Sequence, residues 1–129
     1  DYFHIGGSIQ LEWLPETLKR GFFSNNFFEG TITLTNLPES LELLSLAENK
    51  LCGTIDVTHL PANMKRLFLH TNLLEGSTDF SRLPAAMECL WVSSNANLLG
   101  TIVIRVGMAL GVFGSQVQVV RELDREECD

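Results

Sequence analysis

The feature that most constrains this chain is a repeat with a fixed period of 23 residues. Leu-Pro dipeptides recur at that interval, at Leu14-Pro15, Leu37-Pro38, Leu60-Pro61 and Leu83-Pro84. Asparagines keep the same interval, at Asn26, Asn49, Asn72 and Asn95. A constant period of this length is typical of solenoids, in which each repeat is one supersecondary unit stacked on the next. The sequence therefore predicts a repeat solenoid.

Each repeat contains a short stretch in which buried and open positions alternate. In the most regular repeat, residues 43–47 read Leu-Leu-Ser-Leu-Ala, with Leu44 and Leu46 on one face. This period of two predicts a strand that pairs in parallel with the next repeat. The asparagines follow at the bend, where an amide side chain bonds backbone groups, so we expect a buried asparagine ladder. A second alternation, as at Ile55 and Val57, predicts another short strand on the opposite side.

The repeat array is predicted over residues 1–105, as a half repeat followed by four repeats. Its first repeat lacks a strand half, and an uncapped solenoid end exposes core and unpaired strand edges. We therefore expect this N-terminal edge to meet a partner or to self-associate. The incomplete first repeat is also what we would expect if this chain were a segment of a longer repeat protein.

Residues 106–129 depart from the repeat and are predicted to form a degenerate repeat or a C-terminal cap with an acidic tail. Leu110 and Phe113 keep part of the leucine spacing of a fifth repeat. The same segment also suits an irregular strand that covers the last repeat. We expect one short amphipathic helix near the end of this segment, because Val117, Val120 and Leu123 are spaced to lie on one helical face.

Charge and composition argue against several classes of function. A net charge of −7, with nine Lys and Arg residues and no basic run, disfavours nucleic acid as a partner. No apolar run is long enough for insertion into a membrane. Three cysteines form neither an even set nor a metal-ligand spacing, which favours a reducing, cytoplasmic setting. No residues converge as nucleophile, base and orienting group, so we expect no enzyme activity, no metal and no cofactor.

The repeats resemble the leucine-rich repeat superfamily, whose signature is L-x-x-L-x-L-x-x-N-x-L. One stretch matches at every fixed position, through Leu41, Leu44, Leu46, Asn49 and Leu51. The following G-x-I segment is similar in part to plant-type repeats, and the 23-residue phrasing to repeats of protist proteins. The resemblance implies an α/β-type superhelix that is mostly β. It further implies a parallel sheet on the concave face, short strands and turns on the convex face, and little helix.

In this superfamily the open positions of the concave sheet usually bind the partner. Here one column of open positions holds three aromatics, and Arg and aromatic residues are enriched in binding hot spots. The candidate partner-binding residues are Arg20, Phe22, Glu48, Arg66, Phe68, His70 and Trp91. Lateral packing along the sheet is the simpler interpretation of the aromatics.

The resemblance thus implies a non-enzymatic protein–protein interaction module with a protein partner. Two alternatives remain. The chain is a structural or adhesion segment of a longer repeat protein, or a regulatory segment of a larger enzyme or receptor.

Overall fold

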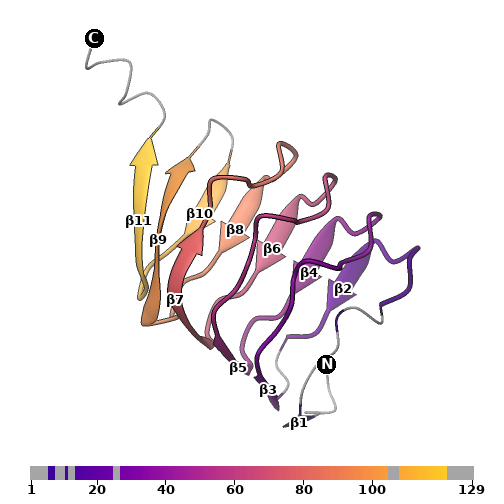
Figure 1. Cartoon of the computed structure of the whole chain (residues 1–129), viewed down its shortest axis with the longest axis horizontal. Coiled ribbons are helices and arrows are strands. Elements are labelled where there is room, and N and C mark those ends of the chain that lie inside the picture. Colours follow the sequence, from indigo (N-terminus) through magenta and orange to yellow (C-terminus); the bar gives the residue numbers. More distant parts are fainter. Residues whose placement is uncertain (1–5, 8–10, 12–13, 25–26, 105–107, 122–129) are drawn as a thin grey trace.

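The computed structural model describes residues 6–7, 11, 14–24, 27–104 and 108–121. This part of the chain forms two parallel β-sheets (Figure 1). The six-stranded sheet contains β1 (Gly6–Gly7), β3 (Phe27–Gly30), β5 (Lys50–Gly53), β7 (Leu73–Asp79), β9 (Asn97–Ile104) and β11 (Gln116–Arg121), in that order. The five-stranded sheet contains β2 (Arg20–Phe22), β4 (Leu43–Ser45), β6 (Arg66–Phe68), β8 (Cys89–Trp91) and β10 (Ala109–Gly111).

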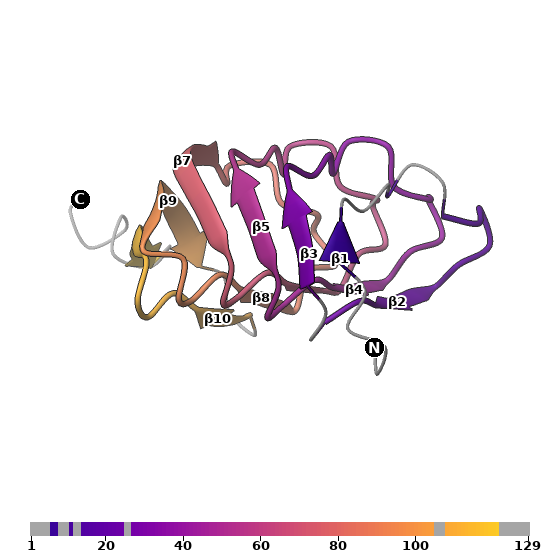
Figure 2. The same ribbon diagram turned by 90° about the horizontal axis from the view of Figure 1, so that it is seen from below.

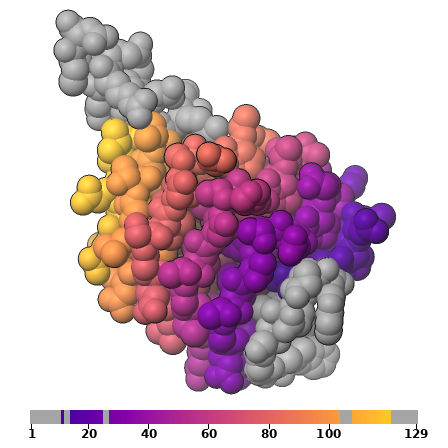
Figure 3. Space-filling model, viewed as in Figure 1, coloured from indigo at the N-terminus to yellow at the C-terminus, as the bar shows by residue number. Residues whose placement is uncertain are grey.

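The chain visits the two sheets alternately, and each strand pairs in parallel with the equivalent strand of the next turn. Figure 2 shows the sheets as opposite layers of one stack. In the space-filling view the turns follow one another as adjacent bands from indigo to yellow (Figure 3). The protein is thus a mostly-β parallel solenoid, and its described residues contain no α-helix. Accordingly, none of them belongs to a helix long and apolar enough to cross a membrane.

The 23-residue period equals one turn of the solenoid. In the five-stranded sheet, Leu44 pairs with Leu67, and Leu67 with Leu90. Each Leu-Pro dipeptide begins a tight turn, in which the proline carbonyl accepts a hydrogen bond from the N–H three residues later, as from Met64 to Pro61 at 3.1 Å. The proline ring fixes φ for such a turn. The repeated dipeptide therefore places the same tight backbone turn once in each of the four repeats.

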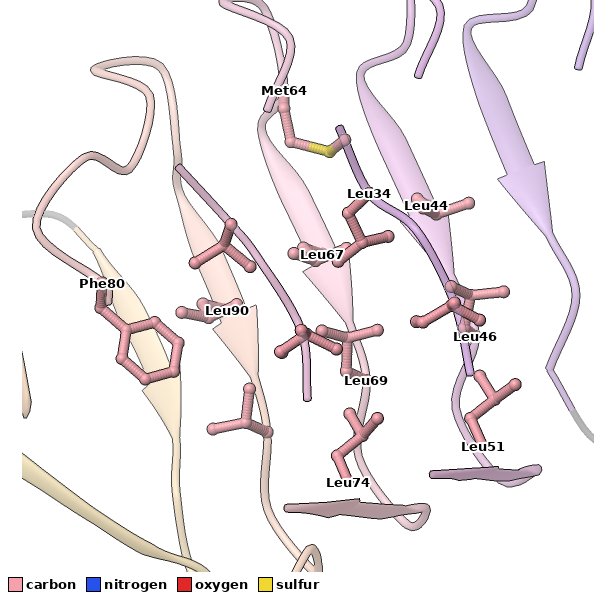
Figure 4. Close-up of a cluster of buried hydrophobic side chains, with 14 of the residues drawn as sticks. Leu34, Leu44, Leu46, Leu51, Met64, Leu67, Leu69, Leu74, Phe80 and Leu90 are labelled. Atoms are coloured by element: carbon pink, nitrogen blue, oxygen red, sulfur yellow. The ribbon is translucent and has the colours of Figure 1, made fainter. Parts of the chain in front are cut away.

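The core lies between the two sheets. Fully buried leucines from the five-stranded sheet, among them Leu44 and Leu67, belong to one apolar cluster with Leu51 and Leu74 from the six-stranded sheet (Figure 4). Replacing one such leucine with alanine typically costs about 2–5 kcal/mol. The predicted burial of Leu44 and Leu67 is confirmed.

A buried asparagine ladder joins the turns, as the sequence predicts. The Asn72 Oδ1 atom accepts a hydrogen bond from the Leu51 N–H at 3.1 Å. Its Nδ2 donates to the carbonyls of Leu46, in the preceding turn, and Leu69, at 2.9 and 3.1 Å. Asn49 and Asn95 make equivalent bonds. Asn26 lies outside the described residues.

In two of the repeats, which contain Ile32 and Ile55, the second strand differs from the prediction. Ile55 and Val57 are buried, as their alternation requires, but residues 54–57 form no strand. Pairing instead comes earlier, and β5 ends at Gly53, whose φ of 81° is in the left-handed region. A period of two reports which side chains face the core and not whether neighbouring backbones are paired. Only β7 and β9 extend beyond the glycine.

The last described turn continues both sheets through β10 and β11. Leu110 pairs with Leu90, so this turn is three residues shorter than the 23-residue step. The helix prediction is wrong here, because Gln116–Arg121 is a strand with Val117 buried. Leu123 lies outside the described residues. Phe113, which keeps the leucine spacing of a fifth repeat, does not enter the core, since 89% of its surface is exposed.

Candidate functional site

The outward side of the five-stranded sheet carries most of the candidate binding residues. Arg20 and Phe22 flank a buried glycine in β2, and Arg66 and Phe68 flank a buried leucine in β6. Because successive side chains of a strand alternate between faces, these residues share the outward side. Phe22 is 53% exposed, whereas Phe68 is half-buried. We call this outward side the open face.

Trp91 is held on the open face by two neighbours. Its six-membered ring lies where a Cβ atom of Gly111 would stand, only 2.1 Å from the Cε3 atom. Gly111 is the residue paired with Trp91 in the adjacent strand β10. The indole N–H donates to the Cys89 sulfur in the same strand. Trp91 is nevertheless 38% exposed, so it presents a preoriented aromatic surface.

His70 lies between the two inner aromatics of the open face. Its ring centroid is 6.2 Å from that of Phe68 and 6.3 Å from that of Trp91, with edge-on geometries that favour aromatic contact. Its Nδ1 atom is buried and has no hydrogen-bond partner among the described residues. His70 is therefore a half-buried spacer between rings and not a solvated surface histidine.

A shallow depression of about 810 Å³ opens beside these rings. We call it the aromatic pocket, and it is lined by Arg66, Phe68, His70, Glu88, Cys89, Trp91, Ser93 and Ala109. Its walls come from the adjacent strands β6, β8 and β10. This lining combines aromatic rings with charged and polar side chains, which suits a ligand surface of mixed apolar and polar character.

A second depression, of about 410 Å³, lies farther along the same face. We call it the basic pocket, and it is lined by Arg20, Phe22, Glu42, Leu43, Lys65, Arg66 and Glu88. Arg66 and Glu88 belong to both pockets, so the two depressions adjoin each other.

The remaining candidate positions are arranged differently. Glu48 is exposed but lines neither pocket. It occupies the bend after β4 with a φ of 59°, and its N–H donates to the His70 carbonyl at 2.9 Å. Ser45 and Ala47, expected to be open, are buried. Both are small residues beside larger neighbours, as where Ser45 pairs with Phe68, which leaves them little contact with solvent.

Sequence reasoning left out several pocket residues. Three of them are charged residues that each directly precede a strand of the five-stranded sheet: Glu42 before β4, Lys65 before β6 and Glu88 before β8. They follow one another at the 23-residue step. That periodicity was available in the sequence as a signal. Gly111 gave no such signal, because the shortened last turn removes it from the 23-residue register.

On the other side of the solenoid, two aspartates form local turn interactions. The Thr58 hydroxyl and N–H both donate to Asp56, and they hold the pKa of its carboxyl below 3.8. The Ser81 hydroxyl and N–H lower the pKa of Asp79 in the same way. The described residues contain no group of three or more His, Cys, Asp or Glu side chains placed to hold a metal ion.

Comparison with known proteins gives no independent assignment of this face. No protein-family model, curated protein or solved structure shows significant similarity to the chain.

Proposed function

We propose that this chain is a leucine-rich repeat protein and a non-enzymatic binding module, whose open face takes a protein partner. The observation that carries the proposal is the pair Phe68 and Trp91, which occupy directly paired positions on adjacent strands. Trp91 stays partly exposed although it is fixed by Gly111 and Cys89.

Preorientation supports a binding role over simple lateral packing. An aromatic side chain that is already ordered loses little conformational entropy when a ligand covers it. Aromatic residues and arginine are also enriched at the centres of protein interfaces. Lateral packing alone would leave the column continuous, whereas Ser45 separates Phe22 from Phe68.

The assignment to the leucine-rich repeat class is supported by the agreement of motif and geometry. The signature leucines fill the core of a parallel solenoid, and the signature asparagines bond the backbone between turns. In this class the equivalent open sheet face usually binds the partner, which agrees with the position of the aromatic pocket.

Selection from a random peptide display library tests the proposal. The wild-type protein is expected to enrich peptides whose binding falls at least about tenfold in the double variant F68A/W91A, the effect of losing about 1.4 kcal/mol or more. The matched control is F27A/L73A, which removes two exposed apolar residues from the six-stranded sheet.

Circular dichroism and thermal unfolding first establish that both double variants keep the wild-type fold. Peptides that bind F68A/W91A as tightly as the wild type would refute the proposal. So would peptides whose binding depends on Phe27 and Leu73 instead.

A further inference from the structure

Two arginines on the open face have no carboxylate partner within the described part of the chain. Arg20 and Arg66 are both exposed, and Leu43 lies between them in the register of the five-stranded sheet. Among the described residues, the one ion pair within 4.0 Å joins His59 to Asp56, on another part of the molecule. Two strand spacings place the arginine backbones roughly 10 Å apart. The pair is thus available to a ligand that crosses Leu43.

The neighbouring charges do not neutralise these arginines. The residues that directly precede β2, β4, β6 and β8 are charged, and the sign of the charge alternates from one strand to the next. In order they are Lys19, Glu42, Lys65 and Glu88. Backbone hydrogen bonds link each of these residues to the next turn, as from the Glu42 N–H to the Lys19 carbonyl at 2.7 Å. This column contains two charges of each sign and is balanced by itself. Arg20 and Arg66 therefore remain as the local excess of positive charge.

The excess is unusual for this chain, whose net charge is −7. Four of its nine Lys and Arg residues gather in these two columns at the beginnings of the five-stranded sheet's strands. At physiological ionic strength the Debye length is about 8 Å, so a ligand on this face experiences mainly the nearby charges. The distant acidic residues do not cancel the attraction of the two guanidinium groups.

The basic and aromatic pockets also share Arg66, so one extended ligand can occupy both. A guanidinium group binds a carboxylate through two parallel hydrogen bonds, which fixes orientation as well as charge. The rings of Phe68 and Trp91 accept an apolar or aromatic side chain at the other end.

We propose that the partner presents an acidic segment with an apolar anchor. Its carboxylates meet Arg20 and Arg66, and its anchor side chain packs against Phe68 and Trp91. This inference rests on the proposed function and specifies the chemistry of the partner. Glu42 and Glu88 line the same pockets, so the carboxylates of the segment must be spaced to meet the arginines alone. Single-stranded RNA fits less well, because its continuous row of phosphates also passes these two glutamates.

Two charge-reversed variants test the inference in the same display selection. R20E/R66E reverses the two arginines of the open face. K50E/R82E reverses two exposed basic residues elsewhere and lowers the net charge by the same amount. The wild type and K50E/R82E are expected to enrich peptides rich in Asp or Glu with one large apolar residue. R20E/R66E is expected to lose at least about tenfold in affinity for those peptides and to enrich Lys-containing peptides instead.

The outcomes separate the two proposals. Peptides that need Phe68 and Trp91 but have no acidic bias, or that bind R20E/R66E unchanged, would overturn the inference and leave the proposed function intact. Enrichment that is independent of Phe68 and Trp91 would refute the proposed function itself. A single-stranded oligonucleotide of matched charge serves as competitor in fluorescence anisotropy. Tighter binding of that oligonucleotide than of the selected peptide would also overturn the acidic-segment inference.

Discussion

Replacing Asn72 with alanine removes one rung of the buried ladder between turns. Only 6% of Asn72 is exposed, so water does not readily replace its side chain. The change leaves the Leu51 N–H without its acceptor and removes the amide donor from the Leu46 and Leu69 carbonyls. All three groups lie where the chain leaves one sheet for the other.

The expected cost follows from these three groups. A buried backbone donor left without an acceptor costs about 1–3 kcal/mol, and each lost hydrogen bond contributes about 1 kcal/mol. We therefore expect N72A to lower the free energy of unfolding by about 3–5 kcal/mol. A domain of this size typically has 5–15 kcal/mol of stability, so the variant should fold but unfold at much lower denaturant concentration.

Urea unfolding followed by circular dichroism measures this loss. The control is N63A, since Asn63 is exposed in the turn after Pro61 and such surface changes usually stay within about 0.5 kcal/mol. A loss at N72A below 1 kcal/mol, or one equal to that at N63A, would refute the structural role of the ladder.

Three further predictions follow from individual contacts. G111A should displace the Trp91 ring, which will appear as a shift of the indole N–H resonance; an unchanged resonance would contradict the packing described here. T58A should raise the pKa of Asp56 towards 3.8, as measured by carboxyl NMR titration. Because the pKa of Asp56 is lowered in the folded state, this carboxylate stabilises the fold above about pH 4, and its contribution is lost as the pH falls through the folded pKa. The free energy of unfolding of T58A should therefore decrease less than that of the wild type as the pH is lowered. Self-association through the N-terminal edge should appear in sedimentation as mass that rises with concentration and falls in F22K, where an exposed phenylalanine of the edge strand β2 gains a charge. A monomer at every concentration would refute it.

Those features that depend only on the period could be predicted from the sequence. Equivalent positions of stacked turns repeat their environment, so the core leucines and the bonded asparagines follow from the 23-residue step. Gly100 follows Gly76 by 24 residues instead of 23. The extra residue is accommodated in the turn after Asn95, where the Leu98 N–H donates to the Asn95 carbonyl at 3.0 Å. Leu98 is fully buried again.

Features that depend on neighbouring side chains could not be predicted in this way. His70 becomes half-buried because rings from two adjacent strands enclose it. Ser45 loses its exposure although its position in the motif is an open one. The contact of Trp91 with Gly111 joins a regular turn to the shortened last one, where the motif no longer gives the register.

Amide chemical-shift mapping with a peptide selected by the wild-type protein tests the binding face most directly. The peptide comes from an unbiased library, so the mapping does not presuppose where it binds. We expect the largest shifts in β6 and β8 and at His70, with smaller shifts at Arg20 and none in β5. Shifts concentrated in β5 and β7 of the six-stranded sheet would contradict the assignment of the open face as the binding surface.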